Sequence, residues 1–395
     1  MLLQLHFYSD RALATPDLND LYKNYLHEVS ATDDRRQFDL ATIEFVAELH
    51  DGHTFFWDTF LDESNNQPLG FYALPLDGRW VVRESRLDNL KPGEVISKVD
   101  GTAIEAFFLQ QQRYIPASST VARRRNLFLF PYVFPEKFTL TLEDGRQVAV
   151  DRASLSKPPQ RTESRWVNPG ATAYIRISSF FDPLMEEMAL YDLRQFHHAK
   201  VLIIDVRNNP GGIPPERLIR ALMNRPYRGW AESTDTCGEP INPDDEEPKN
   251  RATAAEVDSS RGCPNSFINS NDDSQTPQVS RVISPSRNAF QGRVILLVDG
   301  GCISACEDFV EPSKDSGRAT LIGETTQGSA GAPFFYDFHN GMSLKIAVKR
   351  DYFPDGSEFE GVGIKPDVEV HTTIEDLKNG RDPVLEKALE LAAKP

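Results

Sequence analysis

Ser304 stands where a side-chain hydroxyl could act as a nucleophile. A short apolar run at Val294–Val298 predicts a buried strand, Asp299-Gly300-Gly301 ends it, and the spacing from Ser304 to Glu311 is helical. A hydroxyl in the first helical turn lies beside unpaired backbone N–H groups and the positive end of the helix dipole, which stabilise an oxyanion. Serine is also a preferred N-cap residue, and the local pattern alone favours that simpler role.

His53 is predicted at a turn between two elements. The helical pattern of residues 1–50 ends at Asp51-Gly52, and an extended aromatic run begins at Thr54. His50 and His53 have a spacing that can bind a metal, but no third ligand lies nearby in the sequence. We therefore expect no metal site, and we expect His50 to complement the carboxyl end of its helix.

A second strand and turn precede the Ser304 segment. The run VLIID at 201–205 is continuously apolar, as in a strand buried on both faces, and the turn that follows contains Gly211 and Gly212. Strands that alternate with helices indicate a parallel α/β sheet, in which the loops after two strands lie at the same edge. The turn at Gly211 and the segment before Ser304 are therefore expected at one edge.

Composition excludes several classes of protein. The formal charge of −16 and the absence of a long basic run argue against a nucleic-acid partner, and 39% hydrophobic residues are typical of a globular chain. No apolar run reaches the roughly 18–20 residues of a membrane span. Met1–Phe7 is too short for a signal peptide, which favours the cytoplasm for the chain as numbered; a leader removed earlier would favour the periplasm or secretion.

The four cysteines are too few for a disulfide scaffold in a chain of 395 residues. Cys302 and Cys306 bracket Ser304 at a helical spacing, which predicts packed thiols. Cys237 and Cys263 flank a polar segment and could close it covalently in an oxidising compartment. No cysteine and histidine cluster has zinc spacing, so neither a metal nor a cofactor is predicted.

The chain is predicted to contain three regions. Residues 1–65 are helical and carry His53, residues 66–153 contain short alternating strands, and residues 154–395 form an α/β region with a polar insertion at about 231–290. Within the second region, LKPGEVISKVDGTAIEAFF resembles the strand-turn-helix segment of PDZ domains, which add a peptide strand to a sheet edge. A small β domain without a peptide groove fits the pattern equally well.

Several motifs in register resemble the C-terminal processing peptidase family, the serine peptidases of family S41. They are, in order, LHDGHT, the PDZ-like segment, LIIDVRNNPGG, LLVDGGCISACEDF, ATLIGETTQGSAG and PDGSEFEGVGIKPDVEV. The resemblance covers roughly residues 40–385 without the polar insertion. It implies a layered α/β catalytic domain similar to crotonase and Clp protease, with an inserted PDZ-like domain.

The resemblance also distinguishes two branches of the family. Tail-specific proteases use a serine and a lysine in a G-K-G turn, but the matching turn here reads GETTQGSAG, with Ser329 in place of the lysine. The branch that includes the tricorn core and the chlamydial protease-like factor uses serine, histidine and glutamate. LHDGHT matches its histidine motif at His53.

The resemblance implies a role for each residue in the hydrolysis of a peptide or protein substrate. Ser304 would attack the scissile carbonyl, His53 would transfer the proton, and Glu360, with Glu358 as its rival, would orient the imidazole. The oxyanion hole would comprise the N–H of Ala305 and one from Gly211 or Gly212. Asn208 and Asn209 are expected to hold the turn.

Other functions remain open at this stage. A catalytically inactive relative could bind a peptide or an apolar ligand on the same fold, and an adaptor could use the PDZ-like segment alone. A cysteine hydrolase based on Cys302 or Cys306 is disfavoured, since neither residue matches a nucleophile position. The sequence leaves a homo-oligomer open.

Overall fold

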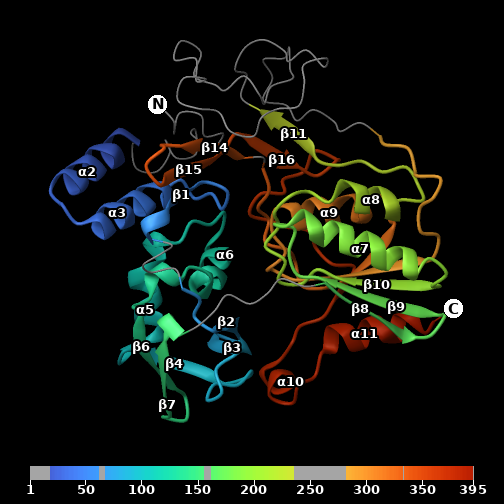
Figure 1. Ribbon diagram of the computed structural model, residues 1–395, viewed down its shortest axis with the longest axis horizontal. Coiled ribbons are helices and arrows are strands. Elements are labelled where there is room, and N and C mark those ends of the chain that lie inside the picture. Colours follow the sequence, from blue (N-terminus) through green and yellow to red (C-terminus); the bar gives the residue numbers. More distant parts are fainter. Residues whose placement is uncertain (1–17, 62–66, 155–161, 235–281, 332, 395) are drawn as a thin grey trace. The chain divides into compact units, whose positions relative to one another are not determined.

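The chain folds into two units, each of mixed α/β structure (Figure 1). A computed structural model describes residues 18–61, 67–154, 162–234, 282–331 and 333–394. The first unit comprises Met1–Lys157, Thr234–Gln275 and Gly331–Arg350; the second comprises Pro158–Ser233, Thr276–Ala330 and Asp351–Pro395. Cys237, Cys263 and most of the polar insertion lie outside the described residues.

The second unit is built on a six-stranded sheet of order β17-β13-β12-β10-β9-β8. All neighbouring strands are parallel except β8, which pairs antiparallel with β9. Every residue of β10 is buried, as the continuous apolar run predicted, because helices cover both faces of the sheet. The strands are β8 (Thr162–Asn168), β9 (Thr172–Ile177), β10 (Val201–Asp205), β12 (Arg293–Val298), β13 (Ala319–Gly323) and β17 (Val368–Glu369).

Helices cover the two faces of this sheet unequally. Figure 1 shows α7 (Pro183–Gln195), α8 (Glu216–Leu222) and α9 (Ala305–Asp315) on one face and α11 (Pro383–Ala392) on the other, with α10 (Ile374–Lys378) preceding α11. Alternate strand residues point to opposite faces, so Leu202 and Leu296 belong to one core and Ile203 and Ile295 to the other.

Helix α9 extends further than its sequence pattern predicts. The expected helix ends at Glu311, before Pro312, but the observed helix continues to Asp315 with Pro312 inside it. Proline removes one backbone N–H donor from the helix interior. Phe309 and Val310 are fully buried in the core beneath α9, and this packing holds the helix through the proline.

In the first unit, the strand that comes after His53 in the sequence, β1, is the edge strand of a three-stranded antiparallel sheet of order β1-β15-β14. The inward face of this sheet packs on helix α3 through a small apolar core. The elements are α2 (Leu18–Ser30), α3 (Arg35–Ala47), β1 (Phe55–Asp58), β14 (Pro333–Asp337) and β15 (Met342–Ala347). Residues 331–350 therefore fold with the N-terminal region, although they are about 300 positions away in sequence.

The remainder of the first unit is a second antiparallel sheet of order β2-β3-β4-β6-β7, with β5 paired to β4. Its core is rich in phenylalanine and contains the fully buried Trp80. The strands are β2 (Phe71–Leu76), β3 (Arg79–Ser85), β4 (Val95–Val99), β5 (Thr102–Ala103), β6 (Lys137–Leu142) and β7 (Gln147–Asp151). The helices are α5 (Ile104–Gln111) and α6 (Thr120–Arg125), with short 3-10 turns at Gln112–Tyr114, Asn126–Leu129, Pro131–Val133 and Arg152–Ser154.

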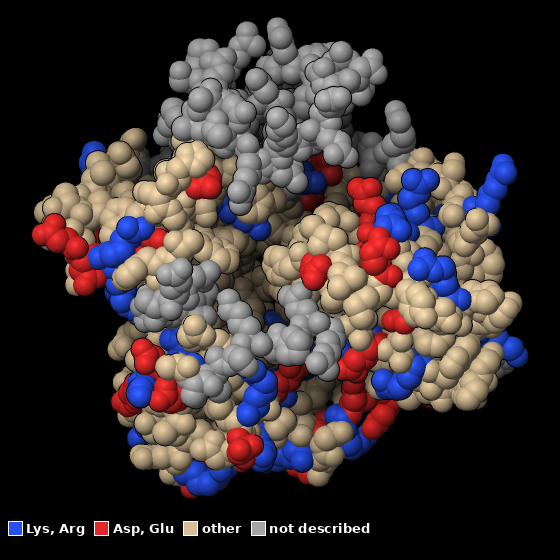
Figure 2. Space-filling model, in the orientation of Figure 1, with Lys and Arg blue, Asp and Glu red and all other residues tan. Residues whose placement is uncertain are grey.

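Sequence patterns predicted the buried strands β10 and β12 and the start of α9 to within a residue or two. The elements that they missed are short or lie at an edge: α6, β8, α10, β11 (Ala231–Thr234) and β16 (Lys349–Tyr352). Charged side chains of both signs are interspersed over the face in Figure 2. Within the described residues, no helix is long and apolar enough to cross a bilayer.

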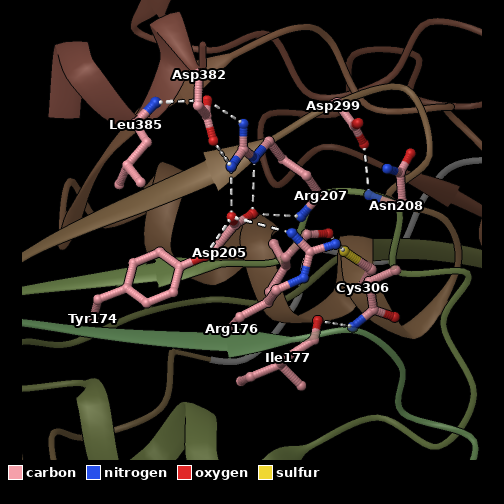
Figure 3. A network of polar contacts seen from close by, with 12 residues as sticks. Tyr174, Arg176, Ile177, Asp205, Arg207, Asn208, Asp299, Cys306, Asp382 and Leu385 are labelled. Atoms are coloured by element: carbon pink, nitrogen blue, oxygen red, sulfur yellow. Dashed lines mark hydrogen bonds and ion pairs between the residues drawn. The ribbon is translucent and has the colours of Figure 1, made fainter. Parts of the chain in front are cut away.

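Arg207 ties helix α11 to the carboxyl end of β10 (Figure 3). Its guanidinium donates to both oxygens of Asp205, at 2.6 and 2.9 Å, and to both oxygens of Asp382, at 2.7 and 2.8 Å. Asp205 is fully buried and also accepts from the Tyr174 hydroxyl. Asp382 caps α11 through the N–H of Leu385.

Arg207→Met should therefore destabilise the fold more than a change at a neighbouring surface arginine. Removing Arg207 leaves the buried Asp205 with only the longer ion pair to Arg176, at 3.7 Å, and breaking a buried ion pair costs up to about 3–5 kcal/mol. The control is Arg381→Met, because Arg381 is exposed and its pair with Glu386 contributes about 0–1 kcal/mol. Chemical denaturation measures both variants, and equal losses of unfolding free energy would contradict this role of Arg207.

Candidate active site

Ser304 has a strained backbone at the N-cap of α9. Its φ is 57° and its ψ is −125°, whereas the caps Asp34, Asp182 and Thr373 have φ values of −83°, −104° and −93°. For a residue other than glycine, such a conformation costs about 1–3 kcal/mol and is found most often at functional sites. A serine that served only as a cap would not require it. This strain favours a chemical role for Ser304 over simple capping.

Hydrogen bonds from two directions hold the Ser304 backbone in this conformation. Its N–H donates to the carbonyl of Ser329 at 2.9 Å and to Oε2 of Glu307 at 3.2 Å. Its carbonyl accepts from the N–H of Glu307 at 2.6 Å. The backbone carbonyl of Ser329 thus helps to fix the position of Ser304.

Glu307 organises the turn that faces the start of α9. Its buried carboxylate accepts from the Thr326 hydroxyl at 2.6 Å and from the N–H groups of Gly328 and Ser329 at 2.7 and 3.0 Å. Burial raises the pKa of this carboxyl to about 8, and the hydrogen bonds oppose the rise. We did not predict this residue from the sequence, although the spacing Ser-x-x-Glu from Ser304 to Glu307 is the signature of a capping box.

Gly211 lies directly against the start of α9. A Cβ atom there would lie 2.5 Å from the carbonyl oxygen of Ile303, 2.8 Å from Cβ of Ser304 and 2.9 Å from the nitrogen of Ala305. Only glycine permits this close approach, and its φ of 85° is also disfavoured for other residues. The loops after β10 and β12 therefore meet at one edge of the sheet, as their sequence order predicted.

The two glycines of this turn differ in the use of their N–H groups. The N–H of Gly211 donates to Oδ1 of Asn209 at 2.9 Å, and Nδ2 of Asn209 donates to the carbonyl of Ile177 at 3.1 Å. Asn209 thus holds the turn. In the described part of the chain, we see no hydrogen bond from the N–H of Gly212 or Ala305. These two groups are available to a ligand.

Glu360 is linked to Ser304 by hydrogen bonds through the turn at 328–330. Its Oε1 accepts from the N–H of Ala330 at 3.0 Å, and the N–H of Gly361 donates to the carbonyl of Gly328 at 2.7 Å. Glu360 is buried and Glu358 is exposed. Burial strengthens the electrostatic effect of a carboxylate on a neighbouring group, whereas water screens an exposed one. This difference favours Glu360 over Glu358.

His53 belongs to the first unit, whereas Ser304, Ala305, Gly211, Gly212 and Glu360 lie together in the second. The ring is buried, at 3% exposure, and its backbone N–H donates to Oδ1 of Asp51 at 3.0 Å. Thr54 donates to the other oxygen of Asp51 and accepts from the N–H of Ala347. Burial and then the Lys345 ammonium lower the pKa of His53 to about 3, so the imidazole is neutral near pH 7.

The prediction of packed thiols at Cys302 and Cys306 is wrong. The two residues form a disulfide, with their Cα atoms 5.3 Å apart. Their spacing is not helical because α9 begins at Ala305, so Cys302 lies in the preceding turn. Since the bond occupies both sulfurs, neither cysteine offers a free thiol for a hydrolase. Within the described ranges, no group of three or more candidate ligands could hold a metal.

Glu307→Gln should destabilise the site and loosen the turn at 326–329. The amide places an NH2 group opposite N–H or hydroxyl donors, so at least one buried donor is left unpaired, at about 1–3 kcal/mol each. The control is Glu216→Gln, an exposed residue in the first turn of α8, for which we expect a change within about 0.5 kcal/mol. Denaturation measures the loss, and hydrogen exchange measures protection at Gly328 and Ser329. Unchanged protection would contradict the role of Glu307.

The relatives that match by sequence include three that are named as proteases. A probable CtpA-like serine protease of Staphylococcus aureus is 23% identical over 72% of this chain and 47% of its own length. A carboxyl-terminal-processing protease of Synechocystis is 25% identical over 59% of this chain and 44% of its own length. A carboxy-terminal-processing protease of Bartonella bacilliformis is 29% identical over 23% of this chain and 21% of its own length. The chain spans less than half the length of these curated relatives.

Solved structures share the fold. Mature CPAF complexed with lactacystin has a TM-score of 0.66 at 16% identity, and the alignment covers 99% of this chain and 95% of the other. The photosystem II D1 C-terminal processing protease has a TM-score of 0.50 at 17% identity, with 95% and 96% covered. The description of peptidase family S41 matches residues 171–370, about half of the chain, and includes Ser304 and Glu360. This protein is therefore a member of peptidase family S41.

Proposed function

We propose that this protein is a serine endopeptidase that hydrolyses peptide bonds of a peptide or protein substrate by a Ser-His-Glu mechanism. The observation that carries the proposal is the strained backbone of Ser304 at the start of α9. The proposal is supported by two N–H groups that make no hydrogen bond among the described residues, that of Ala305, which follows Ser304, and that of Gly212, which follows the Gly211 packed against Ser304. Such an arrangement suits attack on a carbonyl carbon and stabilisation of the resulting oxyanion.

The reaction would proceed in two halves. Ser304 Oγ attacks the scissile carbonyl while His53 accepts its proton, and the N–H groups of Ala305 and Gly212 donate to the oxyanion. His53 then returns the proton to the leaving amine as the C–N bond breaks, which leaves an acyl ester on Ser304. Water attacks the ester while His53 accepts its proton, and His53 then gives this proton to Ser304 Oγ as the ester C–O bond breaks, which releases the carboxylic acid and restores Ser304.

We assign the third role to Glu360, which would orient the His53 imidazole and stabilise its protonated form. Its burial and its proximity to the turn at 328–330 support this role over that of the exposed Glu358. Ser329 at the position of the family's lysine supports the serine-histidine-glutamate branch over the serine-lysine branch. Ala305 and Gly212, rather than Gly211, would form the oxyanion hole, because Asn209 engages the N–H of Gly211.

We propose in addition that the chain is divided into three regions. Residues 1–65 would form a helical segment that carries His53, and residues 66–153 a PDZ-like domain in which an antiparallel sheet packs with α5. Residues 154–395 would form a crotonase-like layered catalytic domain with an insertion at about 231–290. Helices on both faces of the parallel sheet in the second unit support this layering.

Substitution of the proposed catalytic residues should separate their roles. We expect Ser304→Ala and His53→Ala each to abolish measurable peptide hydrolysis and Glu360→Gln to leave a trace, whereas loss of one oxyanion donor typically costs about 10²–10³ in rate. A quenched-fluorescence peptide library measures the rates, and a fluorophosphonate probe should label Ser304 in the wild type.

The matched control is Glu358→Gln, which changes the same residue type two positions away and should be nearly neutral. A larger loss with Glu358→Gln than with Glu360→Gln would reverse the assignment of the third residue. Folded wild-type protein that neither reacts with the probe nor cleaves any library peptide would support an inactive binding protein instead.

The pH dependence of cleavage should reflect the low pKa of His53. Burial and the cations of Lys345 and Lys349 disfavour the protonated ring, and Asp51 only partly opposes them. Because the neutral imidazole accepts the proton from Ser304, activity should fall only as pH drops toward the His53 pKa of about 3. We therefore expect kcat/KM to lose no more than half of its value down to pH 5. An acid limb centred near 6.5 would contradict this environment for His53.

A further inference from the structure

The sheet β1-β15-β14 has an outward face that differs from its packed face. Phe56, Leu344 and Ile346 point inward and pack with residues of α3. Side chains alternate along a strand, so their neighbours point the other way. On the outward face, Lys345 stands directly opposite Phe55 on one side and Phe335 on the other, and Trp57 follows in the next row.

Lys345 is a half-buried cation held between two aromatic rings. Its Nζ lies 4.9 Å from the centre of the Phe55 ring and 5.6 Å from that of Phe335. In the described part of the chain, Lys345 makes no hydrogen bond and no ion pair, and Asp51 is the one carboxylate that favours its charge. Aromatic faces only partly replace the water that a lysine loses on burial. This ammonium therefore retains unused capacity for an anion.

The same cation lies close to His53. Its charge is the largest electrostatic contribution to the environment of that ring after burial. His53 lies in the turn just before β1, where the next residue, Thr54, accepts from the N–H of Ala347, two positions after Lys345. Trp57 and Phe335 are 46% and 51% exposed, so apolar surface borders the cation on the side away from His53. The unpaired cation and the exposed aromatic rings thus share one sheet face, and the turn that carries His53 leads into the edge strand of that sheet.

We propose that Lys345, between Phe55 and Phe335, is a specificity-determining subsite that binds a carboxylate of the peptide substrate. The group bound is an acidic side chain close to the scissile bond, and Trp57 and Phe335 contact the apolar part of the neighbouring peptide residues. This inference rests on the proposed function, since it takes His53 as the catalytic base. The unsatisfied ammonium is the observation that carries it, because a carboxylate supplies the missing charge and hydrogen-bond acceptors.

The test compares matched peptides in which one glutamate is moved along a cleaved neutral sequence and replaced by glutamine at each position. At the position that reaches Lys345, we expect kcat/KM to be about tenfold or more higher with glutamate, since hydrogen bonds to charged groups are worth about 1.5–3 kcal/mol. Peptides ending in a carboxylate or an amide separate the two sources of a carboxyl group. A preference that depends only on the free carboxyl terminus would overturn the assignment to a side chain.

Variants of Lys345 should change the ratio of kcat/KM between the glutamate and glutamine peptides, and not only the rate of cleavage. Lys345→Met and Lys345→Gln should bring the ratio of kcat/KM for the glutamate peptide to that for the glutamine peptide to about one, and Lys345→Arg should retain the wild-type ratio. Lys345→Glu should bring that ratio below one and should favour a third peptide with lysine at the same position. The control is Lys137→Met, which removes an exposed cation from β6 in the same unit and should leave the ratio unchanged. A ratio that survives Lys345→Met and Lys345→Gln in folded protein would overturn the proposal.

Binding without turnover separates this inference from the proposed function. In Ser304→Ala protein, fluorescence anisotropy with the same labelled peptides should show tighter binding of the glutamate peptide, and Lys345→Met in that background should remove the difference. If the wild type cleaves peptides but neither assay detects a carboxylate preference, the subsite is wrong and the peptidase stands. If no peptide is cleaved but the preference in binding persists, the peptidase is wrong and the carboxylate site stands.

Discussion

The buried carboxylate of Glu307 is the interaction on which the candidate site depends. It accepts four hydrogen bonds, one from the start of α9 and three from the turn at 326–329, and so joins these two segments through a single side chain. A positive φ at Ser304 is costly, so it persists only where surrounding contacts determine the backbone. Glu307 and the carbonyl of Ser329 provide those contacts on the side of the turn, and Gly211 provides the close packing on the other side.

The parallel sheet of the second unit explains how segments that are distant in sequence meet at this point. Strands β10 and β12 are neighbours in register, so the loops after Asp205 and Val298 leave the sheet at the same edge. The Asp299 side chain then accepts from the N–H groups of Asn208 and Gly301, and the N–H of Ile303 donates to the carbonyl of Asn209. The two loops therefore form one backbone scaffold before any catalytic side chain is considered.

Charge in the first unit has two linked consequences. The Lys345 ammonium disfavours protonation of His53, and its own pKa is lowered to about 8 by burial, so near pH 7 the ring is neutral and the lysine mostly charged. A neutral ring can accept a proton, and a charged lysine can attract an anion. A carboxylate bound at Lys345 would offset part of the cation's effect on His53. Substrate charge and the basicity of the imidazole are therefore coupled in the proposed mechanism.

The sequence by itself determined the elements and their order around the site. Continuous apolar runs identified the buried parallel strands, and strand breaks followed by helical spacing located Ser304 and the turn at Gly211. These features depend on local patterns, which persist whatever surrounds them. The resemblance to the S41 family added His53 and Glu360, which no local pattern connects to Ser304.

Only the tertiary structure decided how the backbone and polar groups at this edge are used. The positive φ of Ser304, the four bonds to Glu307, the engagement of the Gly211 N–H by Asn209 and the burial of Glu360 all depend on contacts between segments. The disulfide at Cys302 and the continuation of α9 through Pro312 likewise depend on where the helix begins and what it packs against. Residue spacing records none of these, because a hydrogen bond or a packing contact between distant segments exists only once the chain has folded.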